Sequence, residues 1–116
     1  MIARIESSTH AWRGLAVFIK TTHNFWIHFT CAMFAVYLGL ALRISNVEWA
    51  LIVIAIGFVF VAETFNSAIE IDIDLTSPNF HPYARDTKDV AAGAVLLSVA
   101  VAILIGVIVF LPKLIY

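Results

Sequence analysis

Long apolar stretches separated by short polar ones dominate this chain. Residues 21–42 and 90–112 form runs of 22 and 23 residues without Lys, Arg, Asp or Glu. A helix needs about 20 apolar residues to cross a bilayer, so each run is long enough to span one. Glu48 and Glu63 enclose only 14 such residues. A helix that crosses there must therefore continue through Glu63 to about residue 71, which brings this glutamate to membrane depth.

This pattern predicts a single all-α integral membrane domain over residues 1–116, with transmembrane helices over roughly 25–43, 48–71 and 89–111. A tight turn at residues 45–46 joins the first two helices. A polar cytoplasmic loop over 75–87, which contains two prolines, separates the second from the third.

The first 22 residues follow a different pattern. Apolar side chains recur there at helical spacing, while the basic and hydroxyl side chains fall on other faces. This predicts an amphipathic interfacial helix over 1–22 that lies on the membrane surface. The apolar positions are Ile2, Ile5, Trp12, Ala16 and Ile19.

Composition supports a membrane protein and excludes other classes. Hydrophobic residues make up 62% of the 116 residues and charged residues only 13%, which is too apolar for a soluble domain. The net charge of -1 and the absence of a basic tract give no support to nucleic-acid binding. The single cysteine, Cys31, excludes a disulfide framework within the chain.

Basic residues are unevenly divided between the two predicted sides of the membrane. The N-terminal segment and the 75–87 loop with its flank carry five, whereas the other side carries two. The positive-inside rule then places the N-terminus, and the loop with it, in the cytoplasm. The five are Arg4, Arg13, Lys20, Arg85 and Lys88, and the two are Arg43 and Lys113.

Acidic residues gather near the cytoplasmic end of the second and third spans, where six of the eight lie between positions 63 and 89. At about 100° per residue, Glu63, Asn66, Glu70 and Asp74 share one face of a helix. A polar seam between helices is one interpretation of this face. An ionisable group at membrane depth favours function instead: Glu63 as a proton acceptor, and Glu70, nearer to water, as a ligand of Mg²⁺.

The following segment carries further polar candidates. Arg85 and Lys88 suit neutralisation of a polyphosphate, and Asp89 suits a helix cap, a ribose contact or a metal ligand. Ordinary cytoplasmic anchor charges are the alternative for Arg85. No P-loop or kinase-type glycine loop is present. The histidines around the first span, at positions 10, 23 and 28, are interpreted as interfacial residues rather than metal ligands.

The segment Glu63-Thr-Phe-Asn66-Ser-Ala-Ile-Glu70, followed by Ser77-Pro-Asn-Phe-His81-Pro and Lys88-Asp89-Val-Ala-Ala-Gly-Ala-Val-Leu96, resembles the prokaryotic diacylglycerol kinase family. The stretch from Ala11 to Leu15 and the Asn24-x-x-x-His28 signature extend the resemblance over nearly the whole chain. It implies a small lipid kinase of the bacterial inner (cytoplasmic) membrane. Such kinases transfer the γ-phosphate of magnesium ATP to a lipid hydroxyl, and they work as homotrimers with sites shared between subunits.

The resemblance also implies roles for individual residues. Glu63 matches the catalytic base, Asn66 an active-site asparagine and Glu70 a metal-binding glutamate. The positions that match contacts to ATP are Trp12, Asn79, His81, Lys88 and Asp89.

Two positions depart from the family pattern. Thr22 stands where better-known members carry a metal-binding glutamate, and Trp26 stands where an arginine is common. The first departure leaves Mg²⁺ to Glu70, ATP oxygens and water, or else reduces activity. The loop around His81 and the run after Asp89 resemble the undecaprenol kinase branch most.

Three functions follow for comparison with the structure. The favoured one is an undecaprenol kinase that makes undecaprenyl phosphate. The first alternative is a diacylglycerol kinase that makes phosphatidic acid. The second is a non-enzymatic bundle in which Glu63 and Glu70 relay protons or bind an ion.

Overall fold

The computed structural model describes residues 2–22 and 24–116, and this part of the chain forms helices without a strand. The helices are α1 (Ile2–Thr21), α2 (Phe25–Leu42), α3 (Asn46–Thr76) and α4 (Pro82–Ile115). The predicted all-α architecture is confirmed. Three of the helices, α2 to α4, are long and apolar enough to cross a membrane.

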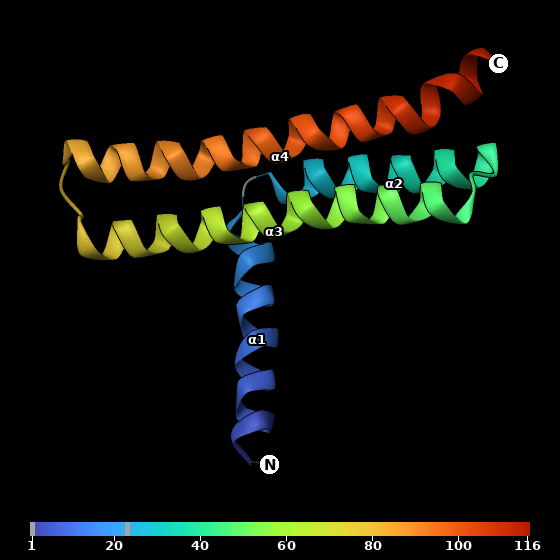
Figure 1. Cartoon of the computed structure of the whole chain (residues 1–116). Coiled ribbons are helices and arrows are strands. Elements are labelled where there is room, and N and C mark those ends of the chain that lie inside the picture. Colours follow the sequence, from blue (N-terminus) through green and yellow to red (C-terminus); the bar gives the residue numbers. More distant parts are fainter. Residues whose placement is uncertain (1, 23) are drawn as a thin grey trace.

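The arrangement consists of a long antiparallel hairpin with two shorter helices added to it (Figure 1). Helices α3 and α4 pack against each other along their length, and α2 lies beside the first half of α3. Helix α1 leaves this bundle crosswise near the middle of α3. That direction is the one expected of a helix that lies along a membrane surface while the others cross it.

Helix lengths indicate how far the hairpin extends beyond the membrane. At 1.5 Å per residue, the 18 residues of α2 span about 27 Å and the 31 residues of α3 span about 46 Å. The hydrocarbon core of a bilayer is only about 30 Å thick. Because α2 lies beside the first half of α3, the second half of α3 and the first turns of α4 protrude past the level at which α1 leaves (Figure 1).

The hairpin end corrects the predicted 75–87 loop. Only residues 77–81 lie outside helices there, since α3 continues to Thr76 and α4 already begins at Pro82. Pro82 occupies the first turn of α4, where a missing N–H is tolerated. The preceding His81 caps the helix, its Nδ1 accepting a hydrogen bond of 3.1 Å from the Tyr83 N–H. Pro82 therefore marks a helix start, and Pro78 lies in a connection of only five residues rather than in a long loop.

The opposite end is closed by a tight connection. Arg43 adopts a left-handed conformation (φ 52°) that ends α2. Ser45 and Glu48 then form a reciprocal capping box at the start of α3. The apolar core lies against this end, where Ile44 and Ile52 pack with residues near the C-terminus of α4. Glu48 also pairs with Lys113 at 3.2 Å, which ties α3 to the end of α4.

Candidate active site

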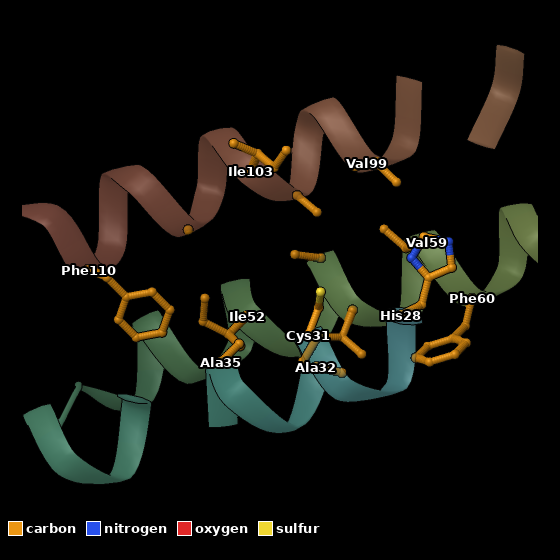
Figure 2. Close-up of a pocket in the computed structure, with 14 residues that line it drawn as sticks. His28, Cys31, Ala32, Ala35, Ile52, Val59, Phe60, Val99, Ile103 and Phe110 are labelled. Atoms are coloured by element: carbon orange, nitrogen blue, oxygen red, sulfur yellow. The ribbon is translucent and has the colours of Figure 1, made fainter. Parts of the chain in front are cut away.

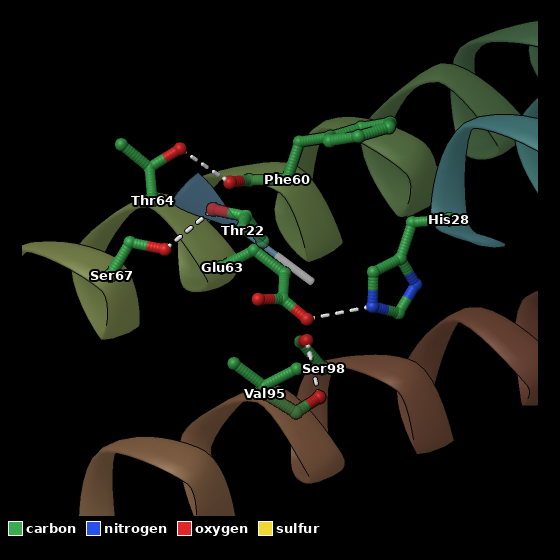
Figure 3. Close-up of polar contacts among 8 residues, drawn as sticks. All are labelled: Thr22, His28, Phe60, Glu63, Thr64, Ser67, Val95 and Ser98. Carbon is green, nitrogen blue, oxygen red and sulfur yellow. Dashed lines mark hydrogen bonds and ion pairs between the residues drawn. The ribbon is translucent and has the colours of Figure 1, made fainter. Parts of the chain in front are cut away.

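Glu63 lies at the centre of the polar region. It is only 3% exposed, although large apolar side chains elsewhere on these helices are widely exposed. Its Oε1 shares a hydrogen bond of 2.7 Å with Nε2 of His28, which is carried by α2 (Figure 3). An ionised carboxylate can only accept hydrogen bonds, so the ring nitrogen donates in that state. The pair joins α2 to α3 at the level where α1 leaves the bundle.

Small hydroxyl side chains surround this carboxylate (Figure 3). Thr22, just after α1, shares a hydrogen bond of 2.7 Å with Ser67 of α3. Ser98 of α4 is fully buried, and its hydroxyl donates to the Val95 carbonyl at 2.7 Å. Each hydroxyl therefore has a partner within the protein. Thr22, where the resemblance implied a glutamate, thus contacts α3 close to Glu63.

Asn66 follows one turn after Glu63 on the same face of α3. Its Oδ1 is buried and has no hydrogen-bond partner among the described residues. A buried polar oxygen without a partner costs free energy, so such atoms are few in native proteins and each calls for an explanation, such as a bound ion or a catalytic role. Amide oxygens are good ligands for hard cations and good acceptors for N–H and O–H groups.

Towards the hairpin end, the polar face of α3 becomes exposed. Glu70 is exposed, and Asp74 forms an ion pair with Lys88 of α4. A hollow of about 240 Å³ lies next to this ion pair, and it is lined in part by Asn79 and His81, the two loop residues predicted to contact ATP. Its polar lining consists of Asp74, Ser77, Asn79, His81, Arg85 and Lys88.

The structure brings together most, but not all, of the residues predicted from the sequence. Asn79, His81 and Lys88 share the hairpin-end hollow, and the exposed Asp89 follows Lys88 directly. Trp12 lies apart from them, because it is 73% exposed on α1 and lines a separate groove between α1 and α3. Within one chain it does not join the hairpin-end hollow.

Among the described residues, no group of three or more His, Cys, Asp or Glu side chains is placed to hold a metal ion. Glu70 has Asn66 one turn before it and Asp74, which pairs with Lys88, one turn after it on the same face of α3. Mg²⁺ is commonly bound by one or two carboxylates together with substrate phosphates. The protein oxygens fit an ion that arrives with a nucleotide better than one held by a closed protein cage.

The residue of this polar cluster that sequence reasoning did not connect to Glu63 is His28. Its partner Glu63 lies 35 positions away, so spacing along the chain gave no reason to pair them. The signal available was the Asn24-x-x-x-His28 signature, which placed this histidine one turn into a membrane helix. His23, interpreted together with it, lies outside the described residues.

An apolar groove begins at His28, the partner of Glu63, and continues into the part of the bundle that can span a membrane (Figure 2). It has a volume of about 260 Å³ and lies between α2, α3 and α4. His28 and Phe60 line one end and Phe110 the other. Small side chains keep it open, namely Ala32, Ala35, Ala55, Ala102 and Gly106. One member of the polar pair, His28, therefore lies at one end of the apolar groove.

Comparison with known proteins identifies the family. Residues 9–110 match the family model of prokaryotic diacylglycerol kinase. The chain is 38% identical to undecaprenol kinase of Bacillus subtilis (strain 168) over 109 residues, which cover 94% of this chain and 89% of that protein.

Two relatives named diacylglycerol kinase are also similar. One, from Synechocystis sp. (strain ATCC 27184 / PCC 6803 / Kazusa), is 32% identical, with 95% of this chain and 63% of that protein covered. The other, from Escherichia coli (strain K12), is 25% identical, with 86% of this chain and 82% of that protein covered. These matches to membrane kinases argue against the alternative that the protein is a non-enzymatic helical bundle. The chain belongs to the prokaryotic diacylglycerol kinase family and is a membrane lipid kinase, a phosphotransferase whose acceptor is an alcohol.

Proposed function

We propose that this protein transfers the γ-phosphate of ATP to the hydroxyl of undecaprenol and so makes undecaprenyl phosphate. The observation that carries the proposal is the position of Glu63. Its buried carboxylate is hydrogen-bonded to His28, which lines one end of the apolar groove, and it lies on the same face of α3 as Glu70 and Asp74. A lipid alcohol that lies in the groove would present its hydroxyl at that level, and phosphate would approach from the other side.

In the proposed reaction, Glu63 acts as the general base. It takes the proton of the lipid hydroxyl, whose oxygen forms a bond to the γ-phosphorus while the bond to the ADP oxygen breaks. General-base catalysis of this kind contributes about 10²- to 10⁴-fold in rate. Burial of Glu63 excludes water, which would otherwise compete for the phosphoryl group.

Asn66, Glu70 and Lys88 have supporting roles in the proposal. The nucleotide binds in the hollow lined by Asn79, His81 and Lys88. The Lys88 side chain is partly open to solvent, so its ammonium group can neutralise phosphate charge. Asn66 Oδ1 and the Glu70 carboxylate would hold Mg²⁺ that enters with ATP. When bound, the ion neutralises charge on the phosphates.

Undecaprenol is favoured over diacylglycerol by the more extensive match to a relative named undecaprenol kinase, which covers 89% of that protein at 38% identity. The volume of the groove also favours an acceptor with one hydrocarbon chain. A cavity of 150 Å³ holds benzene, so about 260 Å³ has room for roughly ten carbons of one apolar chain. Diacylglycerol, with two chains at its polar end, remains the alternative acceptor.

We also propose a homotrimer, with sites shared between subunits, in the bacterial inner membrane. One chain leaves Glu70 exposed and Trp12 away from the hairpin-end hollow. Polar groups near a bilayer need cover that one three-span chain supplies only in part. Neighbouring subunits would complete the site in this arrangement.

The test is transfer of labelled γ-phosphate from magnesium ATP by purified protein in lipid-doped micelles, with undecaprenol and diacylglycerol offered separately. Glu63→Gln is the control variant, which keeps size and polarity but removes the base. We expect phosphorylation that favours undecaprenol, falls at least about 100-fold in the variant and leaves ATP binding intact. Preference for diacylglycerol would reassign the acceptor. Loss of ATP binding in Glu63→Gln would refute the assignment of Glu63 as base.

A further inference from the structure

The two oxygens of the Glu63 carboxylate have different surroundings. Oε1 is held by His28 at 2.7 Å, whereas Oε2 makes no hydrogen bond with any described residue. Figure 3 shows the second oxygen directed away from the imidazole ring. One oxygen is therefore fixed by the protein, and the other is left to act on a substrate.

His28 is well placed to control the orientation of this carboxylate. Its side chain is 17% exposed, and it comes from α2, whereas Glu63 comes from α3. The terminal torsion of a glutamate is broad and only weakly fixed by rotamer preference. A single strong hydrogen bond to Oε1 therefore decides where Oε2 points. The same donor offsets part of the cost of holding a carboxylate charge in apolar surroundings.

The histidine also forms part of the groove wall. His28 and Phe60 line the end of the groove nearest Glu63 (Figure 2). One side chain therefore contacts both the base and the space that would receive the acceptor chain. Its position fixes the base relative to a hydroxyl that enters along the groove.

We infer that His28 is a positioning residue of this kinase, an inference that rests on the proposed function. It donates its Nε2–H to Glu63 Oε1, so that Oε2 faces the lipid hydroxyl. The proton of that hydroxyl passes to Oε2, the lipid oxygen bonds to the γ-phosphorus, and ADP leaves. His28 acts through Glu63 and exchanges no proton with the lipid or with ATP.

The experiment compares three variants at this position in the micelle assay. His28→Leu removes the donor. His28→Gln carries an amide N–H that reaches about as far as Nε2, and His28→Asn carries the same amide too short to reach Oε1. A misplacement of about 1 Å can cost about 100-fold in rate. We expect kcat to fall about 10- to 100-fold in the Leu and Asn variants, with the KM for ATP and lipid within about 2-fold of wild type. The Gln variant should recover most of the rate.

His10→Leu, on the exposed side of α1, is the matched control and should keep the wild-type rate. ATP binding and the thermal midpoint are measured for every variant. If His28→Leu does not fold, the contrast between Gln and Asn decides. A wild-type kcat in the Leu or Asn variant would overturn the inference, as would a Gln variant no faster than Asn. Wild-type protein that phosphorylates neither lipid would refute the proposed function itself.

Discussion

At the scale of single residues, the site concentrates polar atoms that the fold does not satisfy. Glu63 is buried with one hydrogen bond, and the Asn66 amide oxygen is buried with none among the described residues. Each such group costs stability unless a partner arrives. Both lie on one face of α3, facing the region where a phosphate and a hydroxyl would meet in the proposed reaction. This cost is understandable if substrate groups are the missing partners.

Thr22 offers a direct test of the metal requirement. The resemblance noted from the sequence implies a metal-binding glutamate at this position, and Thr22 contacts Ser67 one turn from Glu63. Thr22→Glu supplies a second carboxylate to the Mg²⁺ that Glu70 would hold, so the Mg²⁺ concentration for half-maximal activity should fall, by roughly tenfold for a good carboxylate ligand. Thr22→Val, nearly isosteric, controls for the lost hydrogen bond to Ser67. A requirement unchanged in Thr22→Glu would show that another ligand already completes the coordination.

Sequence reasoning identified part of this site for a clear physical reason. Glu63, Asn66 and Glu70 share one helix, so the helical period alone aligns them on one face. The contact of His28 with Glu63 depends on how α2 packs against α3, which local periodicity does not contain. The interpretation of His28 as an interfacial residue therefore gave no indication of its hydrogen bond to Glu63.

At the scale of elements, the packing of α2 on α3 depends on a close approach at Gly39. A Cβ atom there would lie 2.6 Å from the end of the Trp49 ring and 3.1 Å from Ile44 Cδ1. Gly39→Ala should therefore destabilise this end of the bundle by about 1–3 kcal/mol, seen as a lower thermal midpoint in detergent. Gly57→Ala on α3 has open space around its Cβ and is the matched control. An equal midpoint in the two variants would contradict this account of the contact.

The hairpin end of α3 and α4 carries the proposed nucleotide site. Lys88 pairs with Asp74 across the hairpin and lines the hollow there. Lys88→Ala should raise the KM for ATP roughly tenfold or more, because hydrogen bonds to charged groups contribute about 1.5–3 kcal/mol. Lys113→Ala removes a lysine that pairs with Glu48 at the far end of the bundle and should leave this KM unchanged. An unaltered KM in Lys88→Ala would place the nucleotide elsewhere.

The boundaries of this hairpin show where sequence patterns reach their limit. The apolar runs predicted the parts of α3 and α4 that can lie in lipid, but both helices continue into polar sequence. Pro78 and Pro82 suggested a long loop, yet Pro82 opens α4. The residues between positions 82 and 88 are helical because Pro82 is tolerated in the first turn and His81 caps it, and Lys88 of α4 then pairs with Asp74 of α3. That contact is between elements and is not visible in hydropathy.

At the scale of the whole molecule, the proposed binding sites for the lipid and for the nucleotide lie at different depths relative to the membrane. The groove lies between α2, α3 and α4, in the part of the bundle that can span lipid, and His28, the hydrogen-bond partner of Glu63, lines one end of it. The hairpin end lies beyond the level of α1 (Figure 1). Because α3 rises about 1.5 Å per residue, Glu63 and Asp74 are separated by roughly 16 Å along the helix. A lipid hydroxyl and a water-soluble nucleotide can therefore approach from opposite directions along one helix face.

This arrangement predicts that the hairpin end faces the cytoplasm, where ATP is available and where the positive-inside rule places its basic residues. Single cysteines at positions 79 and 46, introduced as Asn79→Cys and Asn46→Cys in a Cys31→Ser background, test it with a membrane-impermeant maleimide. Position 79 should react only in inside-out membrane vesicles, and position 46 only in right-side-out vesicles. The Cys31→Ser background alone should not react. The reverse pattern would place the proposed nucleotide site on the outer side of the membrane, away from the cytoplasmic ATP. It would refute the predicted orientation.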